Sequence, residues 1–185
     1  LYTPDLDRRV LEDRYGVGPG DYREVAGLRL HVRVEGPADG PALVLIHGFG
    51  ASLQTWDAWA AGLVDRYRVI RFDLPGFGLT GPDPTRDYSD ARSVAVLRTL
   101  LDDLGVARAS LVGNSLGGQV AWTFAAAHPD RVDRLVLIAP GGFLPPEMTY
   151  GQPVPVPAPV RAMVHILPRA LIRATLEPLY GDPAA

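Results

Sequence analysis

A serine between two glycines is the residue of this chain best placed for chemistry. Residues 113–117 read GNSLG and fit the pattern G-x-S-x-G, with an apolar run before them and an Ala-rich helical pattern after them. In that setting a sharp strand-to-helix turn holds the hydroxyl of Ser115 at the carboxyl edge of a parallel sheet. Such a serine can act as a nucleophile if a base activates it and hydrogen-bond donors stabilise the oxyanion.

The sequence offers no evident base or acid for this serine. His128 ends the helix that follows the serine, which places it roughly 20 Å away at 1.5 Å per residue. His31 lies in a predicted hairpin and His165 in a Pro-rich C-terminal part, and no pattern brings either of them close. Asp73 is expected to hold its own loop. The partners of the serine are therefore not evident within the chain.

Composition argues against several other functions. The chain has 185 residues, a net charge of −3 and no cysteine. It therefore predicts no nucleic-acid partner, no disulfide and no cysteine-ligated metal. Its apolar runs are shorter than the eighteen or so residues that span a membrane. The sequence contains no H-E-x-x-H, and no G-x-G-x-x-G leads from a predicted strand directly into a helix, so we expect no metal and no cofactor.

Alternating strand and helix patterns position the serine. Six strands are predicted at 22–25, 28–34, 42–46, 67–72, 109–112 and 134–139, and helices at 55–66, between Ser89 and Gly105, and at 116–128. Strands that alternate with helices predict a mostly parallel sheet with helices on both faces. The continuous apolar run at 42–46 is expected to be buried on both faces of that sheet, and the run at 134–139 predicts another buried strand. In an isolated chain, the sheet would leave one edge unpaired and apolar surface exposed.

The composition changes after Gly142. Six prolines between 145 and 159 exclude a regular element there. Two short helical patterns follow, at 160–167 and 168–176, and their apolar residues would lie over another surface. We therefore predict a core domain over residues 1–142 and the beginning of a helical lid over residues 143–185.

Four motifs make the chain resemble the α/β-hydrolase superfamily, and in particular its serine esterases and lipases. The motifs are HGFG at 47–50, DLPGFG at 73–78, GNSLGG at 113–118 and AAAHPDRVDRLVLIAP at 125–140. They occur in the family's order and spacing and cover nearly all of residues 22–142. The resemblance implies an α/β-hydrolase fold in which GNSLGG forms the nucleophile elbow.

The resemblance also assigns roles to single residues. Ser115 would be the nucleophile, and the backbone N–H groups of Phe49 and Leu116 would form the oxyanion hole. Phe49 and Phe143 would line part of an apolar acyl pocket beneath the lid. Five further residues would shape the two loops without reacting: His47, Gly48, Gly113, Asn114 and Gly117.

In this family the acid and the histidine follow the serine in the chain, after the lid. We therefore expect an N-terminal portion of a longer hydrolase, truncated after six of eight strands, with roughly 90–110 residues to follow. Alone it would be incomplete and inactive unless a second chain or segment supplied the missing strands. All its basic residues are Arg, which suggests a bacterial source. Because the chain starts at Leu1, a removed N-terminal segment and export remain as open as a cytoplasmic location.

The motifs favour hydrolysis of carboxylic esters through an acyl-enzyme on Ser115. A serine at this position argues against dehalogenases and epoxide hydrolases, which use an aspartate. The form G-N-S-x-G-G also resembles enzymes that hydrolyse carbon–carbon bonds in ring-cleavage products, which is the first alternative. A non-catalytic relative that keeps the fold to bind a ligand is the second alternative, because fold does not fix function.

Overall fold

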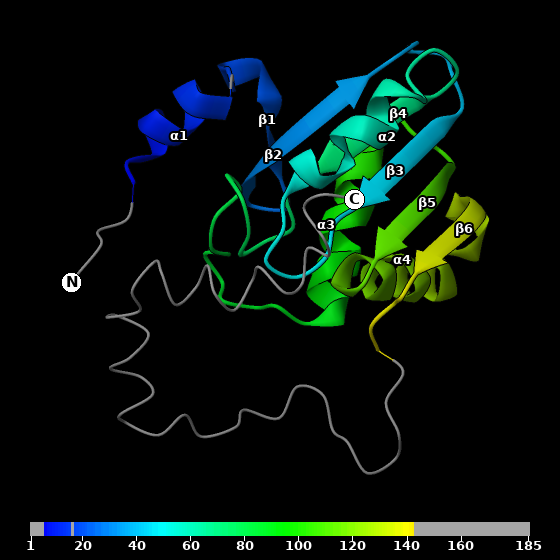
Figure 1. The fold of residues 1–185 in the computed structure, drawn as a ribbon. Helices are drawn as coiled ribbons and strands as arrows, with labels where there is room; N and C mark the ends of the chain where they lie inside the picture. The colour runs from blue at the N-terminus through cyan, green and yellow to red at the C-terminus, as the bar shows by residue number, and fades with distance from the viewer. Residues whose placement is uncertain (1–5, 16, 143–185) are drawn as a thin grey trace, which may run out of the picture.

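The computed structural model describes residues 6–15 and 17–142, which form a six-stranded sheet with helices on both faces (Figure 1). The strands are β1 (Tyr22–Val25), β2 (Leu28–Glu35), β3 (Ala42–Ile46), β4 (Arg68–Phe72), β5 (Ala109–Asn114) and β6 (Val132–Ile138). Their order in the sheet is β1-β2-β4-β3-β5-β6. Strand β2 is antiparallel to β1 and β4, and the other neighbouring pairs are parallel. The predicted mostly parallel sheet is confirmed.

Four α-helices accompany the sheet: α1 (Arg8–Tyr15), α2 (Asp57–Ala61), α3 (Asp90–Asp103) and α4 (Leu116–Ala127). Short 3₁₀ turns lie at η1 (Pro19–Asp21), η2 (Leu53–Trp56) and η3 (Pro129–Arg131). The hydroxyl of Ser89 caps α3 by accepting from the Arg92 N–H at 3.2 Å, as its sequence position predicts. Helix α4 ends where Pro129 stops it.

The central strand β3 divides the core into two layers. Val44 and Ile46 belong to the larger cluster, which includes buried residues of α3 and α4. Leu43 and Leu45 belong to a smaller cluster on the other face, together with Trp56. A strand buried on both faces sits at the centre of the sheet. The loop after β3 therefore emerges between the loops after β4 and β5, where the candidate site lies.

The run at 134–139 was predicted to form a buried strand, and within the described residues it is largely exposed, as the expected unpaired sheet edge implies. Strand β6 lies at the edge of the described sheet and pairs with β5 alone. Its residues Leu135, Val136 and Leu137 are 38%, 47% and 36% exposed. Burial of an apolar run depends on its neighbours in space, and an edge strand has only one neighbouring strand within the described residues.

The helix observed in this region is shorter than the range 55–66 that the sequence pattern predicts. The chain forms η2 and then five residues of α2, after which it continues in turns. Trp56 and Ala60 are buried, but Trp59 is 48% exposed and packs its ring edge-on against Trp56. Gly62 follows α2 directly, and glycine weakens a helix.

The predicted lid at 143–185, with His165 and Phe143, lies outside the described residues. Within residues 6–15 and 17–142, no helix has the length and apolar character needed to cross a membrane. The division at Gly142 therefore stays a prediction.

Candidate active site

Ser115 lies at the sharp turn between β5 and α4. Its φ of 51° and ψ of −116° are unusual for a residue with a side chain. Its backbone is nevertheless fixed, because its N–H donates to the Ile138 carbonyl at 3.0 Å and its carbonyl accepts from the N–H groups of Gln119 and Gly141. Surrounding bonds that hold a strained residue in place are typical of functional sites.

Glycines permit this turn because backbone passes close to them. A Cβ atom on Gly117 would lie 2.5 Å from the His47 carbonyl oxygen, and one on Gly113 would lie 2.7 Å from the Gly118 Cα. Real Cβ atoms do not approach backbone so closely. The small residues of the elbow thus allow α4 to start against the end of β3.

The HGFG loop lies directly on the elbow. A Cβ on Gly48 would come within 3.2 Å of the Ser115 Cβ and 2.9 Å of the Asn114 Oδ1. Asn114 in turn donates from Nδ2 to the Ile138 carbonyl at 3.2 Å. The structure therefore brings together the residues that the sequence analysis places at the site.

Three polar groups at this point have no partner among the described residues. The Ser115 hydroxyl and the backbone N–H groups of Phe49 and Leu116 form no hydrogen bond there. Leu116 is the first residue of α4, where backbone N–H groups lack an intrahelical acceptor and the helix dipole favours negative charge. The geometry thus offers hydrogen-bond donors next to a serine hydroxyl.

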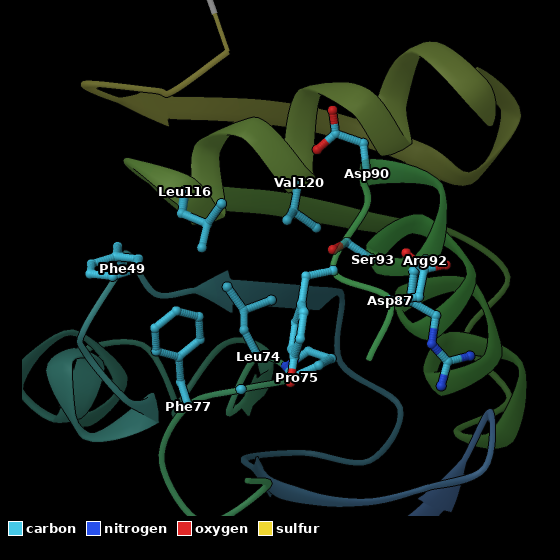
Figure 2. A pocket seen from close by; sticks show the side chains of 12 residues that line it. Phe49, Leu74, Pro75, Phe77, Asp87, Asp90, Arg92, Ser93, Leu116 and Val120 are labelled. Atoms are coloured by element: carbon cyan, nitrogen blue, oxygen red, sulfur yellow. The ribbon is translucent and has the colours of Figure 1, made fainter. Parts of the chain in front are cut away.

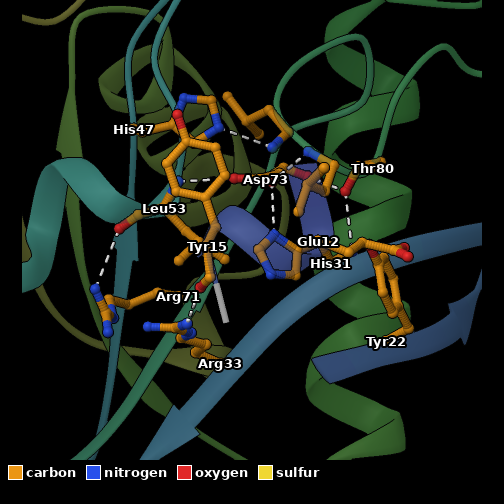
Figure 3. Close-up of polar contacts among 12 residues, drawn as sticks. Glu12, Tyr15, Tyr22, His31, Arg33, His47, Leu53, Arg71, Asp73 and Thr80 are labelled. Atoms are coloured by element: carbon orange, nitrogen blue, oxygen red, sulfur yellow. Dashed lines mark hydrogen bonds and ion pairs between the residues drawn. The ribbon is translucent and has the colours of Figure 1, made fainter. Parts of the chain in front are cut away.

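His47 connects two loops below the elbow. It is buried, its Nε2 accepts from the Leu74 N–H at 2.9 Å, and its Nδ1 lies 2.7 Å from the Gly48 carbonyl oxygen (Figure 3). Burial lowers the pKa of His47 below its ordinary value of 6.5, although the Gly48 carbonyl and the Asp73 carboxylate oppose this shift. A neutral ring with its proton on Nδ1 satisfies both contacts, and neither nitrogen is left to serve Ser115.

Asp73 anchors the loop that follows β4. Its Oδ1 accepts from the Leu53 N–H, and its Oδ2 accepts from the Leu79 N–H and the His31 Nδ1, each at 2.7 Å (Figure 3). The His31 ring and the Asp73 carboxylate are buried together. The expectation that Asp73 holds its loop is confirmed, and the same contact accounts for His31.

His128 also lies where its sequence position predicts. It follows the last residue of α4, and its ring packs against that of Phe124. None of the histidines in residues 6–15 and 17–142 forms a hydrogen bond with Ser115. In the same part of the chain, no group of three or more His, Asp or Glu side chains could hold a metal ion.

A cavity of about 440 Å³ adjoins the elbow (Figure 2). Phe49 and Leu116 line the end nearest Ser115, and the Phe77 ring packs edge-on against Phe49 with 5.3 Å between centroids. Phe49 is 81% exposed, so it stands at the rim of the cavity. The size and the apolar lining are those of small-molecule pockets.

The wall of the cavity formed by residues 87–93 was not predicted from the sequence. There the buried Asp83 pairs with Arg92, with 2.7 Å between Oδ2 and Nε, and Tyr88 and Asp90 face the cavity. Burial alone would raise the pKa of Asp83, but hydrogen bonds from Arg92 and Thr85 outweigh it and leave that pKa below its ordinary value. The bonds from the Thr85 N–H and hydroxyl to Asp83 were readable as a turn signal at Asp-Pro-Thr.

A mostly parallel sheet with a strained serine at a sharp strand-to-helix turn places the protein among the α/β proteins whose serine lies at such an elbow. Comparison with known proteins agrees with this class. The family model for the alpha/beta hydrolase fold matches residues 41–166. The chain belongs to the α/β-hydrolase family.

Individual relatives and solved structures show how similar the chain is to known proteins and how much of each it covers. The chain is 44% identical to an uncharacterized protein of Mycobacterium tuberculosis over 121 residues, which are 65% of this chain and 35% of that protein. It is 37% identical over 164 residues to the 2-hydroxy-6-oxononadienedioate/2-hydroxy-6-oxononatrienedioate hydrolase of Burkholderia vietnamiensis, covering 84% of this chain and 49% of the relative. The structure of the enol-lactonase from Burkholderia xenovorans superposes with a TM-score of 0.58 at 33% identity, over 62% of this chain and 44% of that one. The chain thus spans about half the length, or less, of these relatives.

Proposed function

We propose that the protein containing this chain is a serine hydrolase that cleaves carboxylic esters, with Ser115 as the nucleophile. The observation that carries the proposal is the strained conformation of Ser115 beside two N–H groups that no described residue uses. A neighbouring apolar cavity offers room for a substrate. Similarity to an enol-lactonase, whose substrate class contains an ester bond, supports the choice of reaction.

In this mechanism the hydroxyl oxygen of Ser115 attacks the ester carbonyl carbon. The hydroxyl proton passes to a histidine outside the described residues, and the N–H groups of Phe49 and Leu116 stabilise the oxyanion. One such donor typically stabilises the transition state by about 2.7–4 kcal/mol. The alcohol then leaves with the proton from the histidine, and water hydrolyses the ester bond between the acyl group and Ser115.

Burst kinetics test the proposal in the whole protein that contains this chain. Mixing with p-nitrophenyl hexanoate should release a burst of p-nitrophenol that matches the enzyme concentration, followed by slower turnover. Ser115→Ala should remove the burst and lower kcat by roughly 10⁴- to 10⁶-fold. Ser110→Ala, which changes a serine on β5, the strand that leads to Ser115, is the matched control and should retain both phases. A burst that persists in Ser115→Ala would contradict the proposal.

A carbon–carbon bond hydrolase is the second candidate. The observation that favours it is the 37% identity to the Burkholderia vietnamiensis hydrolase over 84% of this chain. Comparing kcat/KM for 2-hydroxy-6-oxononadienedioate with that for p-nitrophenyl hexanoate separates the two candidates. If neither compound is turned over, the remaining alternative is a binding protein that keeps the fold without the reaction.

A further inference from the structure

The cavity beside the elbow has two chemically different ends (Figure 2). The end next to Ser115 is apolar and is formed by Phe49, Leu74, Phe77, Leu116 and Val120. The other end is formed by the segment before α3 and the first turn of α3, which carry the side chains of Asp87, Tyr88, Asp90, Arg92 and Ser93. A bound molecule that fills the cavity would meet both ends.

The cation at the polar end is already neutralised. Arg92 donates from Nε to the Asp83 carboxylate at 2.7 Å and from one terminal nitrogen to the Ala26 carbonyl at 2.8 Å. Asp83 is only 2% exposed, so this ion pair is shielded from solvent. Arg92 is therefore committed to the protein and is poorly placed to receive an anionic group.

Two carboxylates at the same end, Asp87 and Asp90, form no ion pair among the described residues, although the Arg92 charge also acts on Asp87. Asp87 accepts from the Ser89 N–H at 2.9 Å, and hydrogen bonds from Ser89 lower the pKa of Asp87. Asp90 accepts from the Gln119 Nε2 at 3.0 and 3.2 Å, and that amide carries no charge. With Arg92 paired to Asp83, the polar end has two more carboxylates than cations among the residues that line it or pair there.

We infer that this cavity selects its substrate by charge, with Asp87 and Asp90 as the specificity-determining residues. The inference rests on the proposed ester hydrolysis. The acyl group is apolar next to the carbonyl, which places it against Phe49 and Leu116. Its far end is neutral or cationic, and acyl groups that end in a carboxylate are rejected. Charge repulsion of this kind distinguishes substrates without adding attractive contacts.

A matched series of p-nitrophenyl esters tests this inference in the whole protein. Acyl chains of six and eight carbon atoms are compared with a methyl, a trimethylammonium or a carboxylate group at the far end. At low salt we expect kcat/KM to favour the cationic over the anionic ester by about tenfold or more, as two nearby charges in partly exposed positions would give. In the variant Asp87→Asn/Asp90→Asn this ratio should fall to within about threefold.

Two controls make the result specific. Asp65→Asn removes one exposed carboxylate that does not line the cavity, and it should leave the ratio unchanged. Sodium chloride at 0.5 M should reduce the ratio, because salt screens exposed charges. Equal rates for cationic and anionic esters, or a ratio that survives the double substitution, would overturn the inference.

A binding measurement separates this inference from the proposed reaction. Calorimetry with the Ser115→Ala protein compares the methyl ester of 6-(trimethylammonio)hexanoic acid with the monomethyl ester of hexanedioic acid, which carry the same ester group and opposite far-end charges, and requires no turnover. We expect the cation to bind at least about tenfold more tightly, and we expect the difference to vanish in the protein that also carries Asp87→Asn/Asp90→Asn. Selective cation binding without ester hydrolysis would retain the charge selection and reject the reaction, whereas hydrolysis with equal binding would do the opposite.

Discussion

The loops that follow β3 and β4, here called the lower loops, carry His47 and Asp73. They differ from the elbow around Ser115 in how many of their polar groups are already hydrogen-bonded. In the lower loops His47 and Asp73 bind backbone groups on both sides, so the histidine and the carboxylate are fully occupied. At the elbow the Ser115 hydroxyl and two neighbouring N–H groups have no partner among the described residues. A His and an Asp close to a candidate nucleophile can therefore be structural. Hydrogen-bond donors without a described partner, such as the N–H groups of Phe49 and Leu116, indicate a candidate active site better than residue type does.

The largest loss of stability is expected when a methyl group is added at Gly117 in the elbow. Gly117→Ala would place a Cβ 2.5 Å from the His47 carbonyl oxygen, where the neighbour is backbone and cannot rotate away. We expect a loss of about 3 kcal/mol in the free energy of unfolding, at the upper end for overpacking. Urea denaturation measures it.

Gly20→Ala is the matched control for this substitution. Nothing lies within 4 Å of its added Cβ, so the change should stay within about 0.5 kcal/mol. Equal effects of the two substitutions would show that close approach does not shape the elbow.

A change at Asp73 tests whether the lower loops are only structural. Asp73→Asn leaves one acceptor oxygen where the carboxylate serves two N–H groups and the His31 ring. We expect a loss of about 2 kcal/mol in the free energy of unfolding, because removing one partner leaves buried polar groups unsatisfied. Denaturation of the variant, with Asp65→Asn as the exposed control, measures this loss.

The kcat of Asp73→Asn shows whether the lower loops also take part in the reaction. Since no described contact joins Asp73 to Ser115, kcat of the folded variant should change far less than in Ser115→Ala. A fall near 10⁴-fold, as for a triad acid, would place Asp73 in the reaction after all.

The smallest change in the free energy of unfolding is expected when the pH is lowered and His47 becomes protonated. Because the pKa of His47 lies below 6.5 in the folded protein, the unfolded state binds more protons between the two pKa values. The stability from neutral His47 is present above pH 6.5 and is lost as the pH falls toward the folded pKa. Denaturation at pH 7.5 and 5.0 should show a larger loss in the native protein than in His47→Gln, which does not titrate. Identical losses would mean that His47 is not held neutral.

Patterns that depend on local neighbours were predictable from the sequence. The run 42–46 became β3 with the predicted bounds, and the glycines around Ser115 predicted the turn that the structure shows. The apolar pattern of β6 did not by itself predict how exposed its side chains are, because exposure depends on which strands lie beside β6 in space. The cavity wall was missed for a similar reason, since Arg92 meets Asp83 across a loop whose path the sequence pattern does not specify.

Covalent labelling of Ser115 tests the central claim most directly. The whole protein is treated with a fluorophosphonate and digested, and the modified peptide is identified by mass spectrometry. We expect one adduct per molecule on Ser115, formed at neutral pH and formed more slowly while excess p-nitrophenyl hexanoate competes during the labelling reaction. Folded protein that stays unlabelled at Ser115, or that carries its adduct on another serine, would contradict it.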